Sequence, residues 1–281
     1  MKILAGFIVA TVAAFCCLIR AGTGAAPENI HRQAQWVGKD GAAALDHLTN
    51  DVSQQGTGTQ YEVSRNNPDD MRSIRKAADQ GDARAQARLA SLYKEGKEAT
   101  RDDAVAAKWY HKAADQGFAQ AQYDLGLMYA TGRGVDQDFA QAAVWFRKAA
   151  DQRLAVAQFN LGYMYLKGRG LEQDLAQATE WFRRAADQGD AGAQYSLALS
   201  YENGRGVRRD FVQAIEWLIL AMTNGVPEAE KKLETLERSA TPSQIAEARA
   251  LASRWQRRAA EAANLISLQA QDPGTLATGA P

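Results

Sequence analysis

The feature that most constrains this chain is a short segment that returns every 36 residues. The segment reads Lys-Ala-Ala-Asp-Gln-Gly with small changes, and its copies begin at Lys76, Lys112, Lys148 and Arg184. A fixed period in this range is typical of stacked supersecondary units, each of which buries its apolar face against its neighbours. We therefore expect a repeat array, whose core is built by stacking.

Large apolar residues follow the same period, so the repetition belongs to a core. Four of the six tryptophans share one position of the unit, and leucine, tyrosine and alanine hold three others. These aligned residues are Trp109, Trp145, Trp181 and Trp217; Leu89, Leu125, Leu161, Leu197 and Leu233; Tyr93, Tyr129, Tyr165 and Tyr201; and Ala85, Ala121, Ala157, Ala193 and Ala229. We predict that each set occupies equivalent places in successive units.

Two helices fit within one unit, here called helix A and helix B. The apolar spacing predicts a helix A from Leu154 to Lys167, which ends at Gly168. A helix B then begins at Asp174, and aspartate stands at the same place in the other units. Three of the four copies add a glutamine three residues later, at Gln141, Gln177 and Gln213, as in a capping box. Helix B should therefore run from about 138 to 151 in the second unit.

The combined pattern resembles a known family. It consists of Ala157-Gln158-Phe159-Asn160-Leu161-Gly162-Tyr163-Met164-Tyr165, then Gly168-Arg169-Gly170-Leu171, then Asp174, Ala178, Trp181, Ala185-Ala186 and Gly189. This pattern resembles the Sel1-like repeat, a relative of the tetratricopeptide repeat, over residues 68–258. The resemblance implies an all-α, right-handed solenoid of stacked antiparallel helix pairs, with repeats at about 82–117, 118–153, 154–189 and 190–225.

Two turns depart from the family pattern. The loop after Gly96 lacks the second glycine that the other units have at Gly134, Gly170 and Gly206. Arg153 replaces the glycine that ends the other copies of the opening segment. We expect both turns to differ in shape from their equivalents.

Helical caps should close the array. Asp69 to Gln80 reads as a helix B without its tryptophan, and Thr241-Pro242-Ser243-Gln244 begins a helix that continues through Leu251 and Trp255. Outside the array, residues 27–67 are polar and glycine-bearing, which predicts a flexible tether. Residues 259–281 are expected to be a C-terminal tail.

The first residues predict export. Lys2 precedes an apolar run over residues 3–19, and a stretch of small residues follows up to Ala26, so residues 1–26 read as a signal peptide. The alternative is an uncleaved anchor in the inner membrane, because this run reaches the lower end of the spanning range. Either interpretation places the repeats outside the cytoplasm, in the periplasm or secreted.

The sequence offers little for catalysis or for binding of nucleic acid. The 33 basic residues balance the 33 acidic ones, so no net field attracts a polyanion. No set of metal ligands is evident, and we expect no cofactor. Two Ser-X-X-Lys matches, at Ser73 and Ser91, are interpreted as accidental, so we expect no enzymatic activity. An aligned column of loop arginines, Arg133, Arg169 and Arg205, is interpreted as solvated, with an edge for an acidic partner as the alternative.

A candidate binding surface comes from the helix A positions that the period does not repeat. They are spaced by 4, 3 and 4 residues and so form one stripe on the helix. We call the following residues the helix-A stripe: Arg84, Arg88, Ser91, Glu95, Gln120, Asp124, Leu127, Thr131, Val156, Asn160, Tyr163, Lys167, Gly192, Ser196, Leu199 and Asn203. We single out Arg84, Arg88, Asp124, Leu127, Asn160, Tyr163, Lys167, Ser196, Leu199 and Asn203 as candidate protein-binding residues.

By the resemblance, helix A lines the concave side of the solenoid, so Leu127, Tyr163 and Leu199 would form an apolar track for another protein. The alternative is that these side chains pack between repeats or are scattered on the surface. The sequence therefore favours a non-enzymatic scaffold or adaptor of the cell envelope, whose partner is a protein or peptide segment. Alternatives are a glycan or peptidoglycan module, in which Tyr163 would stack on sugars, and a β-lactamase-like or other hydrolase.

Overall fold

The computed structural model describes residues 68–96 and 99–271, and over these residues the chain consists of eleven helices with no strand. The predicted signal peptide and tether lie outside the described residues. The helices are α4 (Pro68–Asp79), α5 (Ala83–Glu95), α6 (Asp103–Asp115), α7 (Ala119–Thr131), α8 (Phe139–Asp151), α9 (Ala155–Lys167), α10 (Leu175–Asp187), α11 (Ala191–Asn203), α12 (Phe211–Thr223), α13 (Pro227–Glu237) and α14 (Pro242–Gln271). None of these helices combines the length and the hydropathy needed to cross a lipid bilayer.

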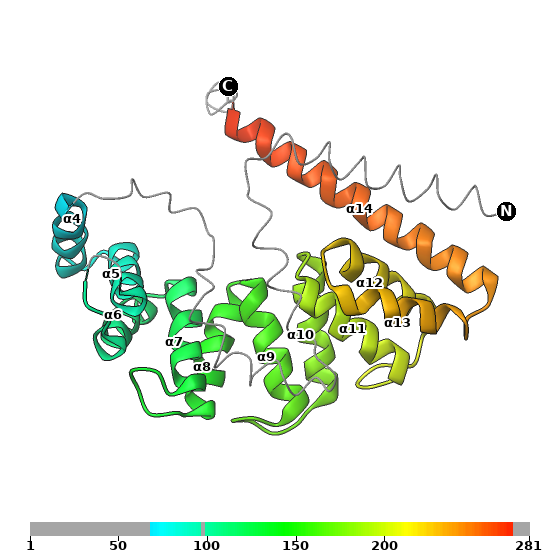
Figure 1. Ribbon diagram of the computed structural model, residues 1–281, viewed down its shortest axis with the longest axis horizontal. Coiled ribbons are helices and arrows are strands. Elements are labelled where there is room, and N and C mark those ends of the chain that lie inside the picture. Colours follow the sequence, from blue (N-terminus) through cyan, green and yellow to red (C-terminus); the bar gives the residue numbers. More distant parts are fainter. Residues whose placement is uncertain (1–67, 97–98, 272–281) are drawn as a thin grey trace, which may run out of the picture.

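Consecutive helices pack in pairs, which confirms the predicted all-α solenoid. Helices α5, α7, α9 and α11 are the A helices, and α6, α8, α10 and α12 are their B partners. Each helix from α4 to α13 packs mainly against its neighbours in the sequence, so the pairs follow one another along an arc (Figure 1). Helix α4 covers the first pair, and α13 and α14 follow the last.

Each helix B begins at the predicted aspartate, but the glutamine three residues later does not complete the cap. The Asp138 carboxylate accepts a hydrogen bond from the Gln141 backbone N–H at 2.9 Å. The backbone N–H of Asp138, which the glutamine was expected to satisfy, donates instead to the carbonyl of Tyr129 at 2.9 Å. The same bond joins Asp174 to Tyr165 and Asp210 to Tyr201. A full capping box forms at the C-terminal cap, where the Thr241 backbone N–H donates to the Gln244 side chain and the Gln244 backbone N–H donates to the Thr241 hydroxyl.

The second loop glycine is required by close packing as well as by its backbone angle. Gly134 has φ +70°, and a Cβ there would lie 2.0 Å from the carbonyl oxygen of Asp103 in the preceding helix B. Gly170 meets the carbonyl of Phe139 in the same way, at 2.1 Å. No side chain fits at such distances, so these glycines let each loop rest on the first turn of the unit before it.

The turn at Arg153 keeps the shape of its equivalents, contrary to expectation. Arg153 adopts φ +66°, in the left-handed region that Gly117 and Gly189 also occupy. Its backbone N–H donates to the Ala150 carbonyl at 2.9 Å, the distance of the corresponding bond from Gly189 to Ala186. The surrounding helices therefore impose this conformation on a residue with a side chain. The other doubtful turn includes residues 97 and 98, which lie outside the described residues.

The tryptophan column forms part of the core as predicted. Trp145, Trp181 and Trp217 are 4–6% exposed and pack with alanines and leucines of the neighbouring helices. Trp109, at the N-terminal end of the array, is only partly buried.

A ladder of glutamines ties the units together, and sequence reasoning did not assign it. Gln158 in α9 is 3% exposed, and its side-chain amide donates to the carbonyl of Ala150 at 3.0 Å, in the preceding helix B. Its side-chain oxygen accepts from Gln188, at the end of its own helix B, at 2.7 Å. The same pair of bonds recurs at Gln86, Gln122 and Gln194. The glutamine of the repeated segment thus supplies this donor at three joints, and Asn224 supplies it to Gln194 at the last.

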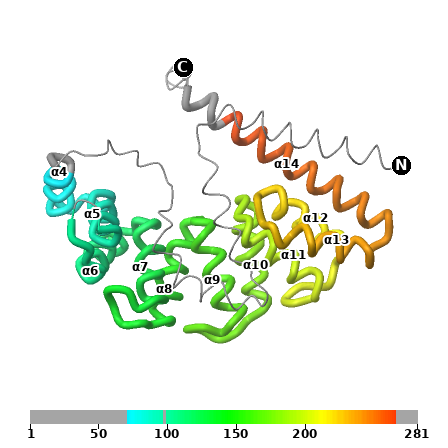
Figure 2. The backbone as a smooth tube through the Cα atoms, viewed as in Figure 1, coloured from blue at the N-terminus to red at the C-terminus, as the bar shows by residue number. Residues whose placement is uncertain are grey.

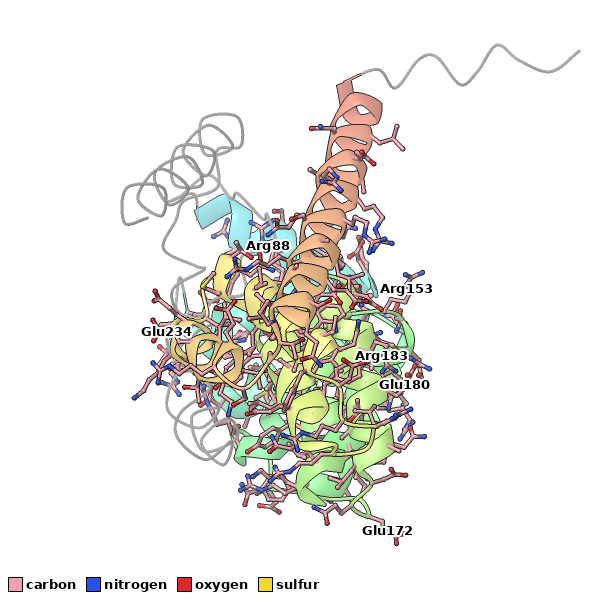
Figure 3. The ribbon with its side chains drawn as sticks, turned by 90° about the vertical axis from the view of Figure 1, so that its right-hand side faces the viewer. Arg88, Arg153, Glu172, Glu180, Arg183 and Glu234 are labelled. Atoms are coloured by element: carbon pink, nitrogen blue, oxygen red, sulfur yellow. The ribbon has the colours of Figure 1, made fainter. Side chains whose placement is uncertain are left out.

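The C-terminal cap is longer than expected. Helix α14 continues to Gln271, because residues 259–271 are rich in alanine and leucine and the first helix breaker is Pro273. Ala248 and Ala252 are buried where α14 packs against α12, and the Trp255 ring lies near Gly189. Residues 256–265 are exposed, and this part of the helix stands away from the repeats (Figures 2 and 3).

Candidate protein-binding surfaces

The helix-A stripe is open at its two ends and closed in its middle. Arg84 and Asn203 are exposed, and Lys167, Ser196 and Leu199 are half-buried, as is Arg88. By contrast, four candidate residues of the second and third units, Asp124, Leu127, Asn160 and Tyr163, are only 3–6% exposed. The surface that a partner could reach is therefore smaller than the sequence indicated.

The predicted apolar track does not run through the middle of the array. Leu127 and Tyr163 belong to the continuous core, so for these two side chains the alternative, packing between repeats, holds. Burial of the Tyr163 ring also leaves it no open face for stacking on a sugar. Leu199 remains half-buried at the edge of this core.

Polar contacts between successive A helices explain part of this burial. The Lys94 Nζ atom of α5 lies 3.0 Å from the Asp124 carboxylate of α7, and Gln120 donates to the same carboxylate at 3.1 Å. Asn160 of α9 is hydrogen-bonded to the Tyr123 side chain of α7 and donates to the Val156 carbonyl at 2.7 Å. Two predicted binding residues are thus engaged within the protein.

The same ion pair removes the chemistry suggested by the second Ser-X-X-Lys match. Burial alone would lower the Lys94 pKa, but Asp124 and Tyr110 beside it raise that pKa well above its usual range. A lysine held as a cation cannot take a proton from Ser91. The Ser91 hydroxyl donates to Glu95 at 2.9 Å.

One partly buried carboxylate of the array has a raised pKa. Asp190 is the N-cap of α11 and accepts a hydrogen bond from the Ala193 backbone N–H at 2.7 Å. Burial raises its pKa to about 6, although the backbone N–H groups of Ala193 and Gly192 act in the opposite direction.

Two of the three aligned loop arginines make contacts between units. Arg133 pairs with Asp103 of the preceding helix B at 3.1 Å. The second unit has Phe139 at the position of Asp103. The Arg169 guanidinium lies over the Phe139 ring, 5.7 Å from its centre. Intramolecular contacts therefore replace the expected solvation at Arg133 and Arg169, whereas Arg205 is exposed, as expected.

The face formed by the B helices carries cations stacked on tryptophans. Lys112 lies 4.0 Å from the Trp109 ring centre, Lys148 lies 3.8 Å from that of Trp145, and Arg184 lies 4.5 Å from that of Trp181. Such stacking stabilises both groups by roughly 0.5–2 kcal/mol. Its sequence signal was the basic residue three places after each tryptophan, which sequence reasoning missed.

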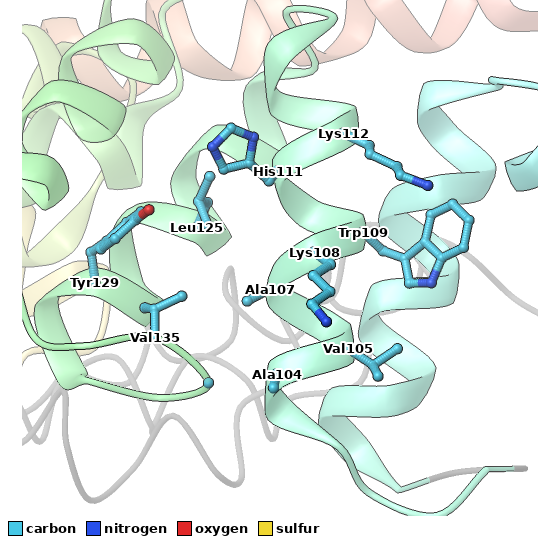
Figure 4. Close-up of a pocket in the computed structure, with 11 residues that line it drawn as sticks. Ala104, Val105, Ala107, Lys108, Trp109, His111, Lys112, Leu125, Tyr129 and Val135 are labelled. Carbon is cyan, nitrogen blue, oxygen red and sulfur yellow. The ribbon is translucent and has the colours of Figure 1, made fainter.

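A cavity of about 580 Å³ lies on the helix-B face, between α6 and the second unit (Figure 4). It is lined by Ala104, Val105, Ala107, Lys108, Trp109, His111 and Lys112 of α6, Leu125 and Tyr129 of α7, and the loop residues Gly134 and Val135. None of the candidate residues of the helix-A stripe lines it. Within the described part of the chain, no cluster of histidine, cysteine and acidic residues could hold a metal ion.

Comparison with known proteins decides the family. Sel1 repeats match residues 83–118, 119–154, 155–190 and 191–226, which together make up just over half of the chain. The chain belongs to the Sel1 repeat family. Its matched Sel1 repeats begin one residue after the units expected from the sequence. Among curated proteins, none matches this Sel1 repeat protein.

Two solved structures are similar. One is c5321, a protective antigen present in uropathogenic Escherichia coli strains that displays an SLR fold, with 38% identity and a TM-score of 0.60. The match covers 68% of this chain and 41% of c5321, so the chain spans less than half the length of that protein. The other is a Sel1 repeat protein from Oxalobacter formigenes, with 34% identity and a TM-score of 0.54, where the match covers 59% of this chain and 74% of that one. Sel1 repeats commonly serve as protein-interaction scaffolds, and they are typically not enzymes.

Proposed function

We propose that this Sel1 repeat protein is a non-enzymatic scaffold of the cell envelope that holds another envelope or membrane protein against its A helices. The observation that carries the proposal is the open end of the helix-A stripe on α11. There Ser196, Leu199 and Asn203 remain accessible next to one another, while the side chains equivalent to Ser196 and Leu199 in the middle units are buried. An accessible leucine between polar side chains suits a segment of another protein.

The location outside the cytoplasm is part of the proposal. It is supported by the apolar run at residues 3–19 and the small residues that follow it. Fusion of residues 1–30 to a reporter that is active only after export would test it. A reporter that stays inactive would contradict an envelope role.

The binding surface is tested by crosslinking in cells. A photo-reactive amino acid at Leu199 should capture a defined partner, whereas the same group at Val144, which is 46% exposed on the helix-B face, should not. With the photo-reactive group placed at Asn203 instead, Leu199→Glu should reduce capture at least tenfold without loss of helicity, and Val144→Glu is the matched control. Equal capture by both variants would remove the stripe as the binding surface.

A further inference from the structure

The cavity beside α6 exists because one joint departs from the pattern of the others. At the third joint, Arg183 of α10 donates to the Tyr201 hydroxyl of the next unit at 2.9 Å. At the second, Arg147 of α8 donates to the Tyr165 hydroxyl and lies over its ring. The first joint has the tyrosine, Tyr129, but His111 stands in place of the arginine.

The shorter side chain leaves the space open. The His111 ring contacts the Asp115 carboxylate of its own helix at 2.8 Å. It also meets the Trp145 ring of α8 edge-on, with 5.5 Å between the ring centres. No arginine therefore covers Tyr129, and the space that Arg147 and Arg183 fill elsewhere becomes the cavity. A volume of about 580 Å³ lies within the range of roughly 300–1,000 Å³ that is usual for binding pockets.

The charge at one position of this joint is also reversed. At the third joint, Glu180 pairs with Arg183 and Arg184, each at 3.0 Å, so the joint supplies its own carboxylate (Figure 3). The equivalent residue of the first joint is Lys108, which is exposed and has no ion-pair partner among the described residues. Lys112 adds a second cation to the cavity lining, and no acidic residue lines it.

The shape of the lining favours an extended ligand. Figure 4 shows Trp109 and Lys112 on one side of α6 and Tyr129 and Val135 on the other, so the lining continues across the helix. Apolar walls alternate with cations along it. A compact small molecule would use one side only.

We propose that this first-joint pocket binds an acidic segment of a protein partner, which supplies the carboxylate that Glu180 supplies at the third joint. An aspartate or glutamate of the partner pairs with Lys108 and accepts from the Tyr129 hydroxyl, and an apolar neighbour packs on Val135, which is partly exposed. The inference rests on the proposed scaffold function but assigns a second surface, on the helix-B face. Its partner segment differs in chemistry from whatever α11 binds.

The test uses the purified full-length protein and a fluorescent peptide in which glutamate alternates with leucine and phenylalanine. We expect saturable binding that weakens at least tenfold when the glutamates become glutamines. His111→Arg, which restores the residue of the other joints, and Lys108→Glu should each weaken binding at least tenfold. Lys231→Glu, the same charge change on exposed α13, should leave it unchanged. Circular dichroism and melting curves verify that each variant is folded.

Several outcomes would overturn the proposal. They are absence of binding to the parent protein, equal binding of the glutamate and glutamine peptides, and unaltered binding by His111→Arg. Competition by free glutamate as strong as that by the unlabelled peptide would show a small-molecule site instead. Capture from Leu199 is measured separately, so loss of peptide binding with capture intact refutes the pocket and leaves the scaffold function standing.

Discussion

The glutamine ladder, with two side-chain hydrogen bonds in each unit, should contribute measurably to the free energy of unfolding. In Gln188→Ala, the exposed donor is lost, and the buried side-chain oxygen of Gln158 is left without its partner at 2.7 Å. An unsatisfied buried acceptor costs about 1–3 kcal/mol. Little packing is lost because Gln188 is exposed. We therefore expect Gln188→Ala to lower the free energy of unfolding by about 1–2 kcal/mol.

A double-mutant cycle separates this bond from other effects. Gln158→Leu removes both ladder bonds, but the Ala150 carbonyl keeps its bond from the Arg153 backbone N–H at 2.9 Å. In the Gln158→Leu background, Gln188→Ala leaves no buried acceptor without a partner, so it should lower the free energy of unfolding by less than about 0.5 kcal/mol. The coupling energy between the two changes should then be about 1 kcal/mol.

Urea unfolding followed by tryptophan fluorescence and by circular dichroism gives both quantities. Gln177→Ala, an exposed helix-B glutamine outside the ladder, is the matched control. If Gln188→Ala behaved like this control, or if the ladder changes were additive, the joints would be held by apolar packing alone.

Three further changes test other features. Arg153→Gly should raise the free energy of unfolding by about 0.5–1 kcal/mol, because relief of the left-handed backbone exceeds the entropy cost of glycine; a loss of stability in urea would contradict this. The folded Asp190 binds its proton more tightly than the unfolded chain does, with a pKa near 6 against 3.8, so its contribution to stability is greatest below pH 4 and is lost as the pH rises through 6. Asp190→Asn should therefore raise the melting temperature at pH 7 and bring no gain at pH 4. Trp145→Ala should cost about 3–5 kcal/mol, and a normal melting temperature would refute the stacked core.

The parts of the fold that were predictable are local in the sequence. The period, the glycine at the end of helix A and the aspartate at the start of helix B each act within a few residues, so the helices begin and end close to where they were expected. The capping glutamines failed because a carbonyl from the preceding helix, such as that of Tyr129, reaches the aspartate N–H first. That contact depends on how the loop folds back, which the spacing of the residues does not specify.

The candidate site was less predictable for a related reason. A position that varies between repeats was interpreted as surface, but Leu127 and Tyr163 vary because each fits a different neighbour in the core. Asp124 varies because only its unit follows Lys94. Deviation from the period therefore marks sites of contact without saying whether the contact is made inside the protein or with a partner.

The volume of the space beside a deviating residue and the charges that line it distinguish a contact inside the protein from a contact with a partner. Arg153 departs from the period, but its turn keeps the backbone conformation and hydrogen bond of its equivalents. His111 departs from the period and leaves a cavity with cations and no carboxylate. His111→Arg should therefore stabilise the protein by about 0.5–1.5 kcal/mol, since it restores the bond to the tyrosine hydroxyl that Arg183 makes. The His111 contact with Asp115 that it loses joins two exposed groups and contributes little. A variant that is more stable and binds the acidic peptide less would identify His111 as a residue kept for binding at the expense of stability. A variant less stable than the parent would show instead that His111 is the better-packed residue at this joint.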